Sequence, residues 1–163
     1  MKNRLLLSAV LFAVVLDTAV VQSQQLTIQV ENGKQIVLTR ADIEALPHSK
    51  VTIGAGAVDA PTTFEGVALN TMLEKAGISL GASMKGKRLA SCLLVEAADG
   101  YRVVIALPET DPAFTDKQIV LAFLKNGKPL DDKEGPFRIV IPDEKRMARW
   151  VRQVTTLKIV DVQ

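Results

Sequence analysis

The sequence has very few residues of the types that form covalent cross-links and metal sites. Among its 163 residues there is one cysteine, Cys92, and one histidine, His48. A single cysteine cannot form an internal disulfide, so the fold must be stabilised by packing. A zinc site of the usual kind needs three or four Cys and His ligands, which this chain cannot supply. Disulfide-rich scaffolds and zinc modules are therefore excluded, and we predict no metal ligands.

Long apolar runs and an excess of one charge are also missing. The longest apolar run, Leu5–Leu16, follows two basic residues near the N-terminus. Because roughly 20 residues are needed to span a bilayer, this shorter run predicts a secretory signal peptide over residues 1–23, cleaved after Ser23. The remaining residues 24–163 carry a net charge close to zero, which argues against general affinity for nucleic acid or membranes. Their length and the lack of a linker predict a single domain.

Several stretches of the remaining chain have the pattern of β-strands joined by turns. Apolar and polar residues alternate on both sides of Asn32-Gly33, and Asp99-Gly100 and Asn126-Gly127 separate two further pairs of apolar runs. Asn-Gly and Asp-Gly pairs accept the positive φ angles of tight hairpin turns. We therefore predict three hairpins, followed by short strands in "GPFRIVIP" and "WVRQVTTLKIVDV".

Two stretches predict helices. Thr39 followed by Asp42 is a helix-start signal, and Pro47 ends the helix that follows. In "VALNTMLEKAGIS" the apolar residues recur at helical spacing and Gly77 follows them, which predicts an amphipathic helix with a glycine C-cap. Many strands with one or two intervening helices indicate an α+β domain with mixed sheets.

The single cysteine fits a structural role better than a reactive one. With Asp99 and Gly100 as the two turn residues, Cys92 would face Leu107 and share a sheet face with Leu94, Val103 and Ile105. No base or cation lies in that set to activate the thiol, so we expect it to be buried and inert.

Other candidate groups carry weaker signals. His48 follows Pro47 in an expected loop, where a hydrogen-bonding role is favoured over catalysis. "GAGA" at 54–57 lacks the third glycine of a dinucleotide-binding motif and predicts a flexible loop. Solvated loops are also expected for the acidic residues that lie beside prolines and glycines, which are Glu109, Asp111, Asp131, Asp132 and Glu134.

A basic cluster surrounds the only tryptophan. Trp150 lies near five basic residues, which are Arg138, Lys145, Arg146, Arg149 and Arg152. If residues 144–150 form a helical turn, Arg146 and Arg149 share a face, and guanidinium groups bind phosphate or carboxylate through two hydrogen bonds. On spacing alone, a solvated charged surface partly balanced by Asp143 and Glu144 is the favoured interpretation of this pattern.

Five motifs occur in an order that resembles the molybdopterin-binding domain of the sulfite oxidase family, and especially its small, exported, single-domain members. They are "FEGVALNTMLEKAGI", "EAADGYRVVIAL", "LAFLKNGKPL", "GPFRIVIP" and "RMARWVRQVTTLKI". The resemblance runs from about Thr39 to Val162. It implies an α+β fold with a coiled, barrel-like mixed β-sheet and a few short helices. It also implies a cleft in which basic residues hold the pterin and phosphate of a molybdenum cofactor, and the matching residues here are Arg149 and, less closely, Arg138 and Arg146.

One departure from the family pattern concerns the metal ligand. Family enzymes bind molybdenum through a cysteine on the segment between a motif like "IEALP" and one like "FEGVAL". Here that segment reads "HSKVTIGAGAVDAPTT" and contains no cysteine, and Cys92 does not match the ligand position. This departure predicts a protein without the standard molybdenum chemistry.

The N-terminus departs as well. Exported enzymes that carry this cofactor generally use a signal with paired arginines, whereas this chain has Lys2-Asn3-Arg4.

From both departures we expect a periplasmic or secreted, non-catalytic module without a bound cofactor. Its expected ligand is a small anionic or pterin-like molecule or a periplasmic protein partner. The alternative is a genuine molybdopterin-dependent oxidoreductase of the periplasm. A third hypothesis, a cofactor-free hydrolase, depends on His48 and scattered carboxylates.

Overall fold

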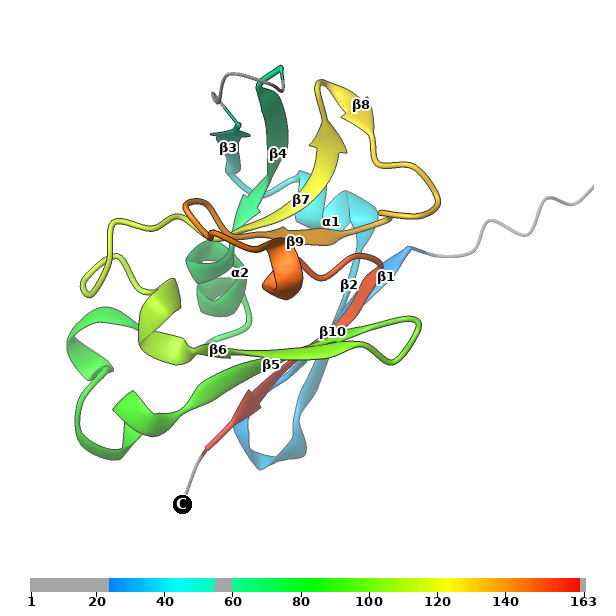
Figure 1. The fold of residues 1–163 in the computed structure, drawn as a ribbon. Coiled ribbons are helices and arrows are strands. Elements are labelled where there is room, and N and C mark those ends of the chain that lie inside the picture. Colours follow the sequence, from blue (N-terminus) through cyan, green and yellow to red (C-terminus); the bar gives the residue numbers. More distant parts are fainter. Residues whose placement is uncertain (1–23, 55–59, 162–163) are drawn as a thin grey trace, which may run out of the picture.

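Two five-stranded β-sheets and a few short helices make up the computed structural model, which describes residues 24–54 and 60–161 (Figure 1). The predicted signal peptide, residues 1–23, and positions 55–57 of the predicted glycine loop lie outside the described residues. Across the described ranges, no helix has the length and apolarity needed to cross a membrane. The α+β prediction is confirmed, with two open sheets, one of which combines parallel and antiparallel strand pairs.

Sheet A has the strand order β2-β1-β10-β5-β6. Its strands are β1 (Gln25–Gln29), β2 (Gln35–Thr39), β5 (Cys92–Ala97), β6 (Arg102–Ala106) and β10 (Val154–Val160). The first and last strands, β1 and β10, pair in parallel, and the other neighbours are antiparallel. The strand predicted at the C-terminal end of the sequence therefore lies in the middle of sheet A.

Sheet B has the order β3-β4-β7-β8, with β9 also paired to β7. Its strands are β3 (His48–Ile53), β4 (Thr62–Ala68), β7 (Val120–Lys125), β8 (Lys128–Pro129) and β9 (Arg138–Val140). All of these pairs are antiparallel. Asn126 and Gly127, between β7 and β8, both have positive φ angles, so the predicted two-residue hairpin turn is confirmed here.

Both predicted helices are present. In α1 (Arg40–Glu44), the Thr39 backbone N–H donates to Asp42 Oδ2 at 2.8 Å while the Asp42 N–H donates to Thr39 Oγ1 at 3.2 Å, which forms the expected capping box. The second helix, α2 (Leu69–Lys75), is followed by Gly77 in a left-handed conformation. Five short 3₁₀ turns complete the helical elements, at Glu31–Gly33, Gly81–Ser83, Gly86–Ala90, Leu107–Thr110 and Met147–Arg149.

The hydrophobic core lies between the two sheets, and Figure 1 shows α2 between β4 of sheet B and β5 and β6 of sheet A. The apolar face of α2, which includes Leu69, Met72 and Leu73, is fully buried. Phe123 on β7 and Phe137 beside β9 are the largest completely buried side chains. These large apolar groups supply the stability that disulfides cannot provide in this chain.

The first hairpin is confirmed, although its turn differs from the prediction. Gln29 pairs with Gln35, and the connection is a 3₁₀ turn over Glu31–Gly33 that is closed by a hydrogen bond from the Val30 N–H to the Lys34 carbonyl. The Asn32-Gly33 pair lies in this longer connection rather than forming a two-residue turn.

The β5–β6 hairpin is present, but its predicted register is wrong by one residue. Cys92 pairs with Ala106, not Leu107, because Ala98, Asp99 and Gly100 form a three-residue turn closed by the Ala97 N–H and the Tyr101 carbonyl. A shift of one residue reverses which sheet face each side chain occupies.

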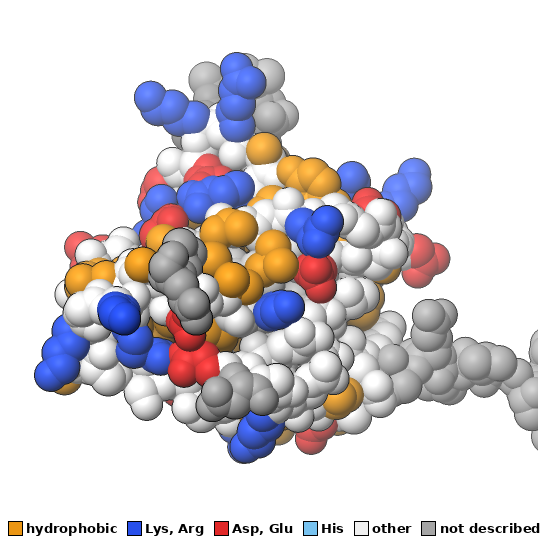
Figure 2. Space-filling model, turned by 90° about the horizontal axis from the view of Figure 1, so that it is seen from below, with side chains coloured by type: hydrophobic (Ala, Val, Ile, Leu, Met, Phe, Trp, Pro, Cys, Tyr) orange, Lys and Arg blue, Asp and Glu red, His pale blue; other side chains and the backbone are white. Residues whose placement is uncertain are grey.

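Cys92 consequently lies on the outer face of sheet A. Leu93 and Val95 fill the core in its place, while Cys92 is half-buried and has Leu94 and Val104 on the same face. Figure 2 shows this outer face, where apolar side chains gather near the middle and charged ones surround them. The prediction of a buried cysteine packed against Val103, Ile105 and Leu107 is therefore wrong.

Candidate functional site

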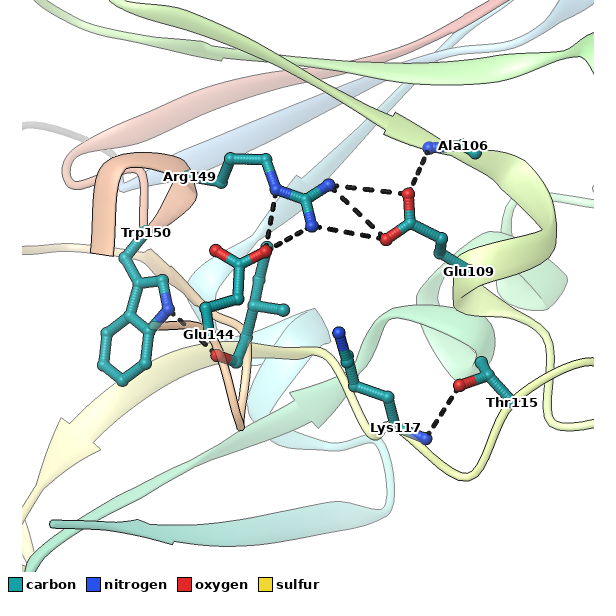
Figure 3. A network of polar contacts seen from close by, with 8 residues as sticks. Ala106, Glu109, Thr115, Lys117, Glu144, Arg149 and Trp150 are labelled. Atoms are coloured by element: carbon teal, nitrogen blue, oxygen red, sulfur yellow. Dashed lines mark hydrogen bonds and ion pairs between the residues drawn. The ribbon is translucent and has the colours of Figure 1, made fainter. Parts of the chain in front are cut away.

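Arg149 lies at the end of the 3₁₀ turn Met147–Arg149, and its guanidinium group is held between two carboxylates (Figure 3). Its Nε donates to Glu144 Oε1 at 2.8 Å, and its Nη2 donates to the same oxygen. On its other side, Nη1 and Nη2 donate to Glu109 Oε2 at 3.4 and 3.3 Å. We refer to Glu109, Glu144 and Arg149 as the Arg149 cluster.

The two carboxylates of the Arg149 cluster differ in their surroundings. The Glu144 side chain is 12% exposed, whereas the Glu109 side chain is 37% exposed and that of Arg149 is 33% exposed. Glu109 Oε1 also accepts a hydrogen bond from the Ala106 backbone N–H at 3.2 Å. Glu144 is therefore the shielded partner of Arg149, and Glu109 is the more solvated one.

The charge on Arg149 is balanced inside the cluster. Burial alone would lower the pKa of Arg149, but its hydrogen bonds to Glu144 and Glu109 outweigh that effect, so the pKa lies above its ordinary value. One arginine between two carboxylates gives the three groups a net negative charge. In this conformation, Nε, Nη1 and Nη2 of Arg149 all donate hydrogen bonds to carboxylates of the protein itself.

Trp150 fixes the backbone next to Arg149. Its indole Nε1 donates to the Ile141 carbonyl at 2.9 Å, and its ring packs edge-to-face against Phe64 of β4 with 5.9 Å between ring centroids. Because Trp150 is buried, these contacts hold the segment from Ile141 to Trp150 against sheet B. The backbone next to Arg149 is thus anchored through the side chain of Trp150.

Arg138, on β9, belongs to a different environment. It is only 9% exposed, and its guanidinium carbon lies 5.4 Å from the centroid of the Phe64 ring and 5.5 Å from that of Trp150. Its Nη1 forms an ion pair with Glu134 at 2.7 Å, and Glu134 also pairs with Lys125 at 3.1 Å. Arg138 Nε and Glu134 Oε2 are buried without a hydrogen-bond partner among the described residues. Arg138 is therefore a largely enclosed cation that packs against aromatic rings.

Arg146 is exposed and has no ion pair within the described ranges. The helical turn proposed for residues 144–150 is limited to Met147–Arg149, and Arg146 itself has an extended backbone with φ of −138°. The expectation that Arg146 and Arg149 share a helical face is therefore wrong. Arg138 and Arg149 are each paired with different glutamates, and among the described residues Arg146 forms an ion pair with none of these glutamates.

His48 is the first residue of β3, not part of a loop. Its Nε2 lies 2.9 Å from the Glu44 carbonyl and its Nδ1 lies 2.9 Å from Glu65 Oε1, and its ring packs edge-to-face against Phe123. The hydrogen bond to Glu44, followed by that to Glu65, raises the pKa of His48, because both partners accept and so favour the doubly protonated ring. Neither ring nitrogen is available as a catalytic base, and the hydrogen-bonding role predicted for His48 is confirmed.

Of the acidic residues expected in solvated loops, Asp131 and Asp132 are exposed as predicted, whereas Asp111 and Glu134 are shielded from solvent. Asp111 is only 2% exposed and accepts hydrogen bonds from the backbone N–H groups of Gly81 and Ala113 at 2.5 and 2.9 Å. Asp131 Oδ1 accepts from the N–H groups of Lys133 and Glu134. These carboxylates accept hydrogen bonds from turn backbones, which is a common structural role of Asp.

Sequence reasoning missed the contribution of Glu109 to the Arg149 cluster. The sequence does contain a local signal. A proline near the start of a short turn, followed by a glutamate, is typical of a turn in which the Glu side chain accepts a hydrogen bond from the backbone N–H just before the turn. That pattern predicts the contact with Ala106. It does not predict the pairing with Arg149, which is 40 positions away.

The cavities near this region are small. A cavity of about 240 Å³ is lined by residues that include Asn70, Thr110, Thr115 and Lys117, and one of about 230 Å³ lies beside Trp150 and Tyr101. Pockets for drug-sized ligands usually measure about 300 to 1,000 Å³. A larger cavity, about 490 Å³, lies elsewhere, at the start of β1 and the segment between β8 and β9. Within residues 24–54 and 60–161, no three His, Cys, Asp or Glu side chains gather to hold a metal.

Comparisons with known proteins agree with this fold. The family model for the oxidoreductase molybdopterin binding domain matches residues 14–163. No curated protein matches significantly. Among solved structures, the chain is similar to the sulfane dehydrogenase SoxCD from Paracoccus pantotrophus, with a TM-score of 0.66, 21% identity, and coverage of 85% of this chain and 38% of that one. At this identity the structural match shows the fold alone, and this chain spans less than half of that protein.

Proposed function

Because the chain belongs to the sulfite oxidase-type family of oxidoreductase molybdopterin-binding domains, we propose that it is an exported member that binds a small anionic or pterin-like ligand without molybdenum catalysis. The proposal places the protein in the periplasm or outside the cell. In this proposal the protein functions by binding the ligand and not through a bound metal.

The observation that carries this proposal is the position of the only cysteine. Family enzymes hold molybdenum through a cysteine in the segment that here runs from His48 to Thr63, and this segment has none. Cys92 lies at the start of β5 in sheet A, whereas the two ends of the matching segment, residues 48–53 in β3 and residues 62–63 in β4, lie in sheet B. The half-buried thiol of Cys92 faces outward from sheet A, so the donor set does not fit a thiolate-held molybdenum.

An anion site remains chemically reasonable at the family's basic motif. Arg149 occupies the place of the family's Lys or Arg before the tryptophan, and it lies next to Trp150, which is anchored by a hydrogen bond to the Ile141 carbonyl. Guanidinium groups bind carboxylates and phosphates through paired hydrogen bonds, so Arg149 is the main proposed contact. Arg138 is too enclosed to be a first contact, and exposed Arg146 would contribute only long-range attraction.

The N-terminal sequence supports export. A short apolar run after basic residues is typical of a signal peptide, and the pairing of Lys2 and Arg4 around Asn3 lacks adjacent arginines. A chain that crosses the membrane unfolded would have to acquire any cofactor outside the cytoplasm. Export in an unfolded state is therefore consistent with a module that functions without a cofactor.

Metal and pterin analysis of protein purified from its native host tests the proposal. We expect less than one tenth of an equivalent of molybdenum by mass spectrometry, and no fluorescent pterin after oxidative extraction. Stoichiometric molybdenum with an extractable pterin would overturn it. In that case, comparing the metal content of a Cys92→Ser variant with that of the wild type would show whether Cys92 is the ligand.

The alternative function is a molybdopterin-dependent oxidoreductase. The match of the family model over residues 14–163 favours it, because that family model describes a molybdopterin-binding domain and covers most of the chain. In this case the cofactor would be held without a cysteine ligand, either by oxygen donors or by arginine contacts alone, with Arg149 as the main one. The same metal analysis separates the two functions.

A further inference from the structure

We propose that the Glu109 carboxylate is a built-in occupant of an anion subsite, and that the carboxylate or oxyanion group of a ligand displaces it. The subsite consists of three donors, which are Arg149 Nη1, Arg149 Nη2 and the backbone N–H of Ala106. This inference rests on the proposed anion-binding function of Arg149 and adds how access to Arg149 is controlled.

The two carboxylates bind Arg149 with unequal strength. Charge-assisted N–H···O hydrogen bonds are usually about 2.7 to 2.9 Å long. The Nε bond to the shielded Glu144 has this length at 2.8 Å, whereas all three contacts with Glu109 lie between 3.3 and 3.5 Å. Glu144 therefore anchors the arginine, and the more exposed Glu109 is the partner that a ligand can replace.

The donors around Glu109 match the shape of an anion with two oxygens on one centre. Oε2 accepts from both terminal nitrogens of Arg149, and Oε1 accepts from the Ala106 N–H at 3.2 Å. A free carboxylate or tetrahedral oxyanion could make the same contacts. Glu109 is tethered in the Leu107–Thr110 turn, which limits how closely it approaches Arg149, and a free ligand lacks this restraint.

Charge and space also favour exchange at this position. When Glu109 moves away, Arg149 faces Glu144 alone, and the two charges cancel. Figure 3 shows the Lys117 side chain pointing toward the space between Glu109 and Glu144, which adds positive charge on the side where an anion would enter. Thr110, in the same turn as Glu109, and Lys117 both line the cavity of about 240 Å³, which leaves room for the remainder of a small ligand.

Replacing Glu109 with alanine, followed by addition of small anions, tests this inference. Sodium acetate and sodium sulfate, titrated into the full chain by calorimetry, represent the planar and tetrahedral classes of ligand. We expect Glu109→Ala to bind at least one of them about tenfold more tightly than the wild type, which corresponds to about 1.4 kcal/mol. The same anion should raise the melting temperature of this variant more than that of the wild type.

Three further variants complete the experiment. The double variant Glu109→Ala with Arg149→Ala should lose the gained affinity, because the main donor is removed. Glu96→Ala is the matched control, since Glu96 pairs with Arg102 on an exposed strand at 3.8 Å and its loss should create no anion site. Glu109→Gln keeps the side-chain volume but removes the charge, so its affinity for the anion should increase by a smaller factor than that of Glu109→Ala. It replaces Glu109→Ala in the titration if the alanine variant does not fold.

The inference is wrong if neither Glu109 variant binds acetate or sulfate more tightly than the wild type, or if Glu96→Ala gains as much. This result is independent of the metal analysis. Molybdenum in the native protein would overturn the proposed function while leaving a gain at Glu109 intact, and a lack of gain in molybdenum-free protein would overturn only the role of Glu109.

Discussion

Replacement of Gly66 by alanine should be one of the most destabilising single changes in sheet B. Gly66 lies on β4 and pairs with Ala122 of β7, next to an irregularity in the strand register. A Cβ atom at Gly66 would lie 2.0 Å from the Leu121 carbonyl oxygen and 2.5 Å from the Ala122 Cα. Both neighbours are backbone atoms, so no side-chain rotation can relieve the overlap.

The size of the effect follows from the movement that alanine requires. Relief of a 2.0 Å contact demands a backbone shift of more than about 1 Å, while paired strands are spaced about 4.8 Å apart. The shift would weaken two or three hydrogen bonds between β4 and β7 at about 1 kcal/mol each, with about 1 to 3 kcal/mol of overpacking. We expect Gly66→Ala to lower the free energy of unfolding by about 3 to 6 kcal/mol.

Urea denaturation followed by circular dichroism measures this loss, and Gly77→Ala is the matched control. Gly77 has a φ of 80° but no atom within 4 Å of an added Cβ, so alanine there should cost only the conformational term of about 1 to 2 kcal/mol. A Gly66→Ala protein that is as stable as Gly77→Ala would refute the steric reasoning. Retention of the wild-type denaturant slope would confirm that both variants unfold as the same cooperative unit.

Three other predictions concern the site and its surroundings. Arg149→Ala should lower the stability by only about 1 kcal/mol, because this ion pair is partly solvated, but should weaken the binding of added sulfate, and titration calorimetry checks the second effect. Trp150→Phe removes the hydrogen bond to the buried Ile141 carbonyl and should cost about 1 to 3 kcal/mol in urea denaturation. The pKa of His48 is raised by folding, so its stabilising effect is complete below about pH 6.5 and is lost as the pH rises through the higher folded value. The stability difference between the wild type and His48→Gln should therefore shrink from pH 6 to pH 9, and a constant difference would contradict this assignment.

The elements that depend on neighbouring residues could be predicted from the sequence. The Thr39 and Asp42 capping box, the glycine after α2 and the Asn126-Gly127 turn all occur as expected. Each of these signals is local, because the residues that form the contact are at most a few positions apart. The α+β class follows from the order of these elements.

The register of the β5–β6 hairpin could not be predicted in the same way. An Asp-Gly pair accepts both two-residue and three-residue turns, and the choice depends on how β5 and β6 pack onto the core. Here Asp99 Oδ1 accepts from the Tyr101 N–H, and the Tyr101 hydroxyl donates to the Ala148 carbonyl, a contact 47 positions away. This distant contact accompanies the register that turns Cys92 outward.

The partners of the charged site residues are also set by tertiary structure. The basic motif identifies Arg149 as a candidate anion contact, but not the carboxylate of Glu109 beside it, which comes from another part of the chain. In the same way, the buried Asp111 bonds to Gly81, 30 positions away. The sequence therefore shows which charged residues are present, whereas the tertiary structure determines which of them pair.

The position of β10 determines when sheet A can be completed during synthesis. This last strand separates β1 from β5, and β1 contacts it in parallel. Before residues 154–160 emerge from the ribosome, β1–β2 and β5–β6 are two separate hairpins, and isolated hairpins are only marginally stable. Sheet A thus forms late, through contacts that join the two ends of the described chain, and removal of residues 154–160 would divide the sheet instead of shortening it.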